Sequence, residues 1–160
     1  MSGQPRSAAV GAPPSLLYVI KQVELAVRAR LDEMVRPAGL TALQYTALTV
    51  LERHPDLTSA HLARNSFVTA QTMADMVATL RSRGLVDRHQ DPRDRRRLVL
   101  SLTAAGRALL DDYRRPVADL EADMLSGLSA EEAAILRQGM LSCREALSRT
   151  SSARSTDRNG

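Results

Sequence analysis

The chain has 160 residues, a formal net charge of +4 and an isoelectric point of about 10.0, enough sequence for one domain with or without a helical appendage for dimerisation. Aromatic residues make up only 2% of the chain, which disfavours proteins that stack single-stranded bases on aromatic rings. No apolar stretch approaches the roughly 20 residues of a membrane span, and no secretory leader is evident. The single cysteine excludes an intramolecular disulfide. We therefore expect a cytoplasmic protein that does not bind membranes.

The N-terminal segment predicts a disordered end and then a long amphipathic helix. Residues 1–14 are rich in Ser, Pro, Gly and Ala and lack apolar periodicity, so we expect disorder there. Ser15 can cap a helix that Pro37 and Gly39 end. Its apolar residues recur at steps of three or four and form one stripe: Leu16, Ile20, Val23, Val27, Leu31 and Met34.

Two shorter helices are predicted next. Thr41 and Gln44 form a capping-box pattern, which opens a helix that ends near Pro55. Thr58 can cap a short helix whose inward residues are Leu62 and Ala63.

The following helix, from Ala70 to Arg83, separates into two distinct faces. Thr69 can cap its start, and Gly84 is a favoured residue just after a helix end. At 100° per residue, the apolar side chains fall on one face, and the other face holds only small or hydrogen-bonding residues. The first face comprises Met73, Met76, Val77 and Leu80, and the second comprises Gln71, Thr72, Asp75, Ala78, Thr79 and Ser82.

Positive charge is concentrated just after this helix. Seven of the 22 basic residues and three of the 18 acidic residues lie between Arg81 and Arg97, so this segment has a net charge of +4, equal to that of the whole chain. Leu85-Val86 and residues 98–102 suit strands, and Asp91-Pro92 opens a turn between them. The segment therefore predicts a short β-hairpin with arginines at its tip.

Two more amphipathic helices complete the chain. Thr103 caps the first, which Pro116 should kink, and Gly127 marks the break before a second capping box at Ser129 and Glu132. The apolar stripes are Leu109, Tyr113, Val117, Leu120 and Met124 on the first helix, and Leu136, Met140, Cys143 and Leu147 on the second.

This order predicts a mainly α-helical fold with a small β-hairpin wing. Two helices joined by a short turn and followed by a basic hairpin are typical of a winged helix-turn-helix, which we place at residues 40–102. The long terminal helices would expose their apolar stripes in a monomer. We therefore expect residues 15–39 and 103–148 to form a helical dimerisation region, and residues 149–160 to form a disordered tail.

A family resemblance rests on residues 84–106 and extends over residues 16–147. The shorter stretch reads GLVDRHQDPRDRRRLVLSLTAAG, and with its Asp94-x-Arg96 and Leu102-Thr103-x-x-Gly106 patterns it resembles the MarR family of bacterial winged helix-turn-helix transcription regulators. The resemblance implies a homodimer with intertwined terminal helices, a recognition helix of each subunit in successive major grooves of double-stranded DNA, and Arg96 as the wing arginine. It also implies that a small phenolic or anionic effector can release a repressor from a pseudo-palindromic operator.

We expect DNA contacts from two helices and the wing. The Gln71 amide can bind adenine, Thr72 can touch a thymine methyl or a phosphate, and Asp75 can accept from cytosine or orient an arginine. The arginines suit the minor groove, where the field of two phosphate backbones favours guanidinium, and which of them enters it stays open. The expected set is Ser59, Arg64, Thr69, Gln71, Thr72, Asp75, Arg93, Arg95 and Arg96.

The sequence predicts no enzyme, cofactor or metal site. We find no glycine-rich phosphate loop, nucleophile elbow or HExxH pattern. No pair among His54, His61 and His89 has the i, i+4 spacing of a helical metal clip. Cys143 lies in an apolar stripe, which predicts a buried and inert thiol.

Two alternatives stay open. Tyr18, Tyr45 and Tyr113 either line an effector pocket or are ordinary core residues. The alternative function is a winged-helix protein-interaction module without DNA binding, which would have no need for a wing of charge +4.

Overall fold

The computed structural model describes residues 12–156, with side chains as far as residue 149. The disorder expected for residues 1–11 and 157–160 lies outside the described residues. The described chain is mainly α-helical with one two-stranded antiparallel hairpin, which confirms the predicted fold class. It forms two compact units, one as far as Arg114 and one from Arg115, so the division falls within helix α5 (Ala104–Leu125).

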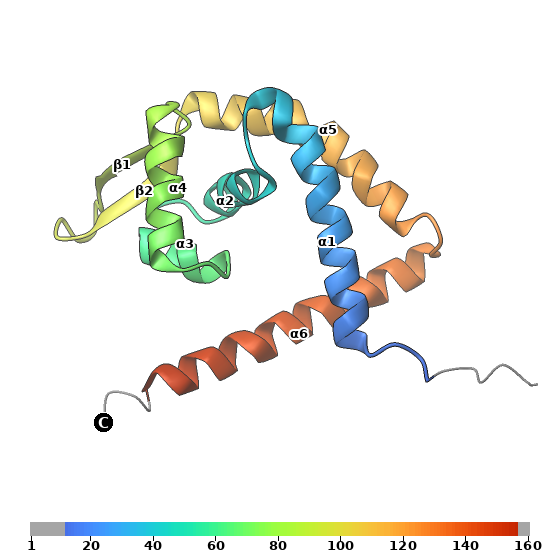
Figure 1. Cartoon of the computed structure of the whole chain (residues 1–160). Helices are drawn as coiled ribbons and strands as arrows, with labels where there is room; N and C mark the ends of the chain where they lie inside the picture. The colour runs from blue at the N-terminus through green and yellow to red at the C-terminus, as the bar shows by residue number, and fades with distance from the viewer. Residues whose placement is uncertain (1–11, 157–160) are drawn as a thin grey trace, which may run out of the picture. The chain divides into compact units, whose positions relative to one another are not determined.

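The first unit begins with helices whose starts follow the predicted caps. The Ser15 side chain accepts a hydrogen bond from the Tyr18 backbone N–H at 3.2 Å, and the capping box of Thr41 and Gln44 is complete. Thr58 likewise caps the third helix through the His61 N–H. The elements are α1 (Leu16–Val35), the 3-10 turn η1 (Arg36–Ala38), α2 (Ala42–Arg53), α3 (Ser59–Asn65) and α4 (Ala70–Ser82) (Figure 1).

Helix α4 has the two faces that the sequence predicted. Its four apolar residues are buried in the core of the unit, and Gln71, Thr72 and Asp75 are exposed. The core is completed by α2, by the hairpin and by the start of α5. Its largest fully buried side chains are Val35, Leu48, Leu51, Leu62, Met73, Val77, Leu80, Val99, Leu100 and Leu110.

The hairpin consists of β1 (Val86–Gln90) and β2 (Leu98–Leu102), with Val86 opposite Leu102 and Gln90 opposite Leu98. The Leu100 N–H donates to the Leu57 carbonyl at 2.8 Å, which attaches β2 to the loop between α2 and α3. Figure 1 shows the hairpin beside α4. This arrangement places the wing next to the exposed face of the helix.

The start of α5 lies very close to the first residues of the hairpin. The Thr103 hydroxyl accepts from the Gly106 N–H at 3.0 Å, which confirms the predicted cap, and it donates to the Gly84 carbonyl at 2.6 Å. A Cβ at position 106 would overlap the carbonyl oxygen of Leu85. Glycine is therefore required here by the close approach of the helix to the chain.

The second unit contains the rest of α5 and helix α6 (Ala130–Thr156). Pro116 lies inside α5, and the capping box at Ser129 is present, because its N–H donates to Glu132 Oε2 at 2.8 Å and its hydroxyl accepts from the Glu132 N–H at 3.2 Å. An ion pair between Arg137 and Glu121 joins the two helices. No helix of the described residues is long and apolar enough to cross a membrane.

Two features of the structure differ from the sequence-based expectations. Helix α6 continues to Thr156 instead of ending near residue 148, because residues 149–156 contain no Gly or Pro and extending a helix avoids the cost of nucleation. The Cys143 side chain is exposed in the single chain, so its expected burial is corrected. Within one chain α1 belongs to the same compact unit as the winged domain, and the dimerisation role expected for residues 15–39 and 103–148 stays a prediction.

Candidate nucleic-acid interface

The exposed face of α4 is organised by hydrogen bonds within the helix. The Thr69 hydroxyl caps α4 by accepting from the Thr72 N–H at 3.1 Å, and it donates to the Thr72 hydroxyl at 2.9 Å. One turn on, the Gln71 amide nitrogen donates to Asp75 Oδ1 at 3.0 Å. Asp75 therefore orients Gln71 within the helix, a role the sequence had not suggested, and the Gln71 carbonyl oxygen and second N–H remain available for a ligand.

Two aspartates shape the seven-residue turn at the tip of the hairpin. The buried Asp91 donates its N–H to the Arg97 carbonyl at 2.9 Å, and its carboxylate accepts from the Arg93 N–H at 2.9 Å. Asp94 Oδ1 accepts from the Arg96 N–H at 3.1 Å. The Asp-x-Arg pattern is therefore a local turn in which the aspartate holds the arginine backbone and leaves its guanidinium outside.

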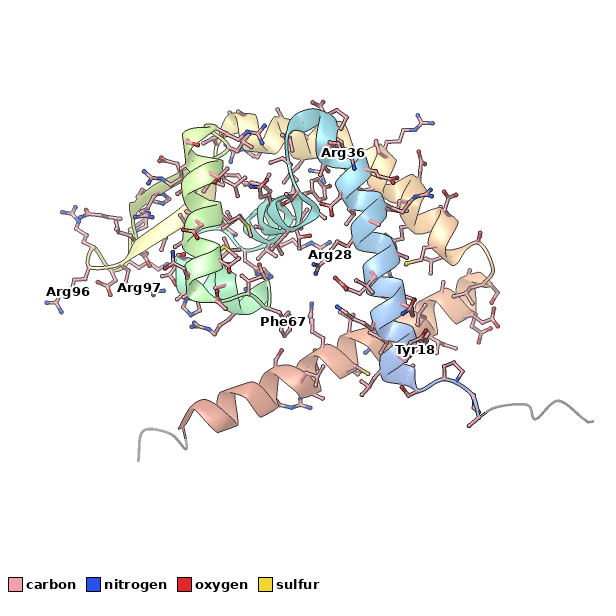
Figure 2. All side chains as sticks on the ribbon, in the orientation of Figure 1. Tyr18, Arg28, Arg36, Phe67, Arg96 and Arg97 are labelled. Atoms are coloured by element: carbon pink, nitrogen blue, oxygen red, sulfur yellow. The ribbon has the colours of Figure 1, made fainter. Side chains whose placement is uncertain are left out.

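The arginines of the turn fall into two groups. The Arg97 guanidinium lies 3.7 Å from the Asp91 carboxylate, so its charge is partly balanced within the wing. Arg93, Arg95 and Arg96 are exposed, and Figure 2 shows Arg96 projecting from the end of the hairpin with Arg97 nearer the strands. The structure thus brings the three expected wing arginines together as an exposed cationic tip.

The expected residues of α3 lie beside this face with different exposures. Ser59, in the first turn of α3, is half-buried, and Arg64, in the last turn, is exposed. The His61 Nδ1 atom lies 2.8 Å from the Thr58 hydroxyl, and His89 pairs with Asp56 at 3.2 Å. Across the residues whose side chains are described, no three His, Cys, Asp or Glu side chains gather in a way that could hold a metal ion.

Sequence reasoning missed Arg83, which braces the C-terminal end of α4. Its guanidinium donates to the carbonyl of Gly39 at 2.7 Å and to that of Ala38, so the C-terminal end of α4 is tied to the junction between η1 and α2. A basic residue at the end of a helix is a recognised capping signal. That signal does not reveal that the acceptors lie more than 40 residues away in sequence.

Two of the three tyrosines that were considered for an effector pocket are in contact. Tyr45 and Tyr113 make an edge-to-face ring contact with centroids 6.1 Å apart, whereas Tyr18 lies exposed in the first turn of α1 (Figure 2). Burial, and then the charge of Glu52, raise the pKa of Tyr45. Beside this pair Arg114 bonds to Asp111 at 2.8 Å and to Glu52 at 2.6 Å, and these bonds raise the pKa of its guanidinium.

Comparison with known proteins gives consistent matches. The model of the MarR family matches residues 38–97. The HTH-type transcriptional repressor Rv2887 of Mycobacterium tuberculosis is 33% identical over 115 residues, which cover 72% of this chain and 83% of the relative. The reduced form of MarR from E. coli has a TM-score of 0.71 at 25% identity, covering 83% of this chain and 98% of that one. A mutant of the same protein, complexed with operator DNA, has a TM-score of 0.70 at 26% identity, covering 80% and 92%.

Proposed function

Because the chain belongs to the MarR family, whose members regulate transcription, we propose that it is a sequence-specific transcriptional repressor that binds double-stranded DNA as a homodimer. The similarity to a structure with bound operator DNA supports the DNA-binding part. The observation that carries the proposal is the pairing of an exposed polar helix face with an adjacent cationic wing.

The chemistry of the two surfaces suggests a division of labour. Gln71, held by Asp75, presents its free amide atoms for a base edge in the major groove. Arg96 and its neighbours on the wing meet the negative field of the minor groove. Phosphate contacts then fix the orientation of the helix. The proposed contact set is Ser59, Arg64, Thr69, Gln71, Thr72, Asp75, Arg93, Arg95 and Arg96.

Exposed apolar side chains on the long helices support the homodimer. Leu16 and Leu17 of α1 are exposed, and so are Leu136 and Met140 of α6. Soluble monomers seldom expose contiguous apolar surface of this kind. A two-fold dimer would bury such faces and present two recognition helices to a pseudo-palindromic site. We further propose that a small phenolic or anionic ligand releases the DNA by binding one conformation of the dimer more tightly than the other.

Salt-dependent duplex binding tests the DNA-binding function. The duplex is one that the wild type selects from a random pool, and the variants are Arg96→Ala and, as a matched loss of one positive charge, Arg36→Ala. Arg36 is exposed at the end of α1 and away from the wing (Figure 2). We expect Arg96→Ala to weaken binding about tenfold and to reduce the slope of log affinity against log salt by about 1, because one phosphate contact is lost.

The control distinguishes an effect of the wing arginine from an effect of the overall charge of the protein. Arg36→Ala should leave both the affinity and the slope near those of the wild type. Equal slopes for the two variants would contradict the role of the wing. A wild-type protein that shows no salt-dependent duplex binding would instead favour the protein-interaction module.

A further inference from the structure

The turn between α3 and α4 carries an exposed aromatic residue in an unusual backbone conformation. Phe67, the single phenylalanine of the chain, is 69% exposed, and its φ of 53° lies in the left-handed region that favours glycine (Figure 2). Among the described residues, Asp56 is the other non-glycine residue with positive φ, and aspartate tolerates this region better than a bulky side chain does.

Phe67 occupies the position that glycine normally takes at the end of a helix. The Val68 N–H donates to the Ala63 carbonyl at 3.1 Å, and the Phe67 N–H donates to the Arg64 carbonyl at 3.3 Å, which is the Schellman pattern. The end of α4 has the same pattern with Gly84 at the equivalent position and a φ of 68°. For folding alone, glycine would be the better residue at position 67.

Burial compensates little for this conformation, because Phe67 is largely exposed. The neighbouring Ser66 has a buried hydroxyl oxygen with no hydrogen-bond partner among the described residues. Two adjacent residues are thus unfavourable for stability, and strained residues of this kind concentrate at functional sites.

The position of the turn between α3 and α4 indicates what Phe67 could contact. Phe67 lies two residues before Thr69, the cap of α4, and three residues after Arg64 of α3. The exposed face of α4 begins at Gln71 in the first turn of the helix. A duplex seated on that face would therefore meet the turn at the edge of the contact surface.

We propose that Phe67 makes an apolar contact with the methyl group of a thymine at the edge of the exposed face of α4, and so contributes to sequence preference. Contact between an apolar side chain and this methyl group is a known form of base readout in the major groove. The inference rests on the proposed DNA-binding function. Because the contact carries no charge, it alters affinity without altering the number of counterions released.

The test compares Phe67→Gly and Phe67→Leu in the full chain on two duplexes. One is the site that the wild type selects from a random pool, and the other has uracil in place of every thymine. We expect Phe67→Gly to melt at the same temperature as the wild type or higher, to bind the thymine duplex about tenfold more weakly, and to keep the wild-type salt slope. Uracil should weaken binding by the wild type but have a smaller effect on Phe67→Gly. Phe67→Leu should keep part of the preference for thymine.

Gly84→Ala provides the matched structural control. A Cβ at position 84 has nothing within 4 Å, so this variant measures the left-handed strain alone and should lower the melting temperature. An unchanged melting temperature would overturn the argument from strain.

Three outcomes would overturn the assignment of Phe67. If Phe67→Gly bound the thymine duplex with the full affinity of the wild type, Phe67 would make no contact that contributes to binding. If the substitution weakened binding equally on the thymine and uracil duplexes, the contact would not involve the thymine methyl group. A loss of dimer in sedimentation would show that the ring binds protein. Failure of the proposed function is recognised separately, because then the wild type itself would show no salt-dependent binding to any duplex.

Discussion

The first unit and the last helix differ in how much apolar surface they bury within one chain. All of the largest fully buried side chains lie between Val35 and Leu110, in the first unit. Helix α6 has no buried residue among those whose side chains are described, although Ile135, Leu136 and Met140 are apolar. The first unit, which contains α1 and the start of α5 as well as the winged domain, therefore completes its own core, whereas α6 carries apolar residues for which a single chain provides little cover.

This difference bears on what stabilises each part. Burial of apolar side chains stabilises the first unit at any protein concentration. In the second unit, the ion pair of Arg137 and Glu121 is exposed, and such pairs contribute at most about 1 kcal/mol. If a second copy of the chain covers α6, as we propose, the stability of that part depends on protein concentration.

The largest effect is expected from negative charge placed on the apolar face of α6. We expect Leu136→Asp combined with Met140→Asp to raise the dimer dissociation constant at least ~100-fold, because an unpaired charge in an interface costs about 3 kcal/mol or more. Operator binding should be lost even though every residue of the proposed DNA-contact set is intact. Sedimentation and melting at several protein concentrations measure the effect.

Gln138→Asp serves as the control for this variant, since it places a negative charge at another exposed position of α6. It should dimerise like the wild type. A doubly substituted protein that remains dimeric, or a wild type that sediments as a monomer at micromolar concentration, would refute the proposed interface.

The second substitution acts within the first unit, where α5 meets the start of the hairpin. Gly106→Ala forces a methyl group onto the Leu85 carbonyl oxygen, where neither backbone can move freely. We expect it to lower the free energy of unfolding by about 3 kcal/mol, at the upper end of the range for overpacking. Denaturant unfolding should show the same loss at every protein concentration. A loss that disappears at high concentration would mean that the first unit does not complete its own core.

The smallest expected effect concerns the brace between α4 and the end of η1. Arg83→Gln removes charge-assisted hydrogen bonds to the carbonyls of Ala38 and Gly39. Because the site is exposed, we expect a loss of ~1 kcal/mol in the free energy of unfolding and no change in dimer dissociation. Gly84→Ala again calibrates local strain at the same helix end. A change in dimer dissociation for Arg83→Gln would show that the brace also acts on the subunit interface.

Much of the architecture was predictable because its causes are local. The caps at Ser15, Thr41 and Ser129 are hydrogen bonds within three residues of sequence, and helix faces follow from a period of 3.6 residues. The same holds for the turn of the wing, where Asp94 and Arg96 are two residues apart. The resemblance to the MarR family also lies in such short patterns, and the comparisons confirm it.

The candidate site was only partly predictable. The sequence placed Gln71 and the wing arginines on exposed surfaces, which the structure confirms, while their contacts with DNA stay predictions. It did not distinguish Arg97, which faces the Asp91 carboxylate, from the arginines beside it, because identical side chains differ only in the partners that the folded turn brings near.

The sequence by itself therefore determined the order, caps and faces of the helices and the position of the basic hairpin, since each depends on residues close together in the chain. Tertiary structure decided three other features: the brace from Arg83 to Gly39, the overlap that keeps position 106 a glycine, and the left-handed conformation of Phe67. The first two join segments far apart in sequence. The third arises because the packing of α3 against α4 requires a tight turn, whichever residue occupies it.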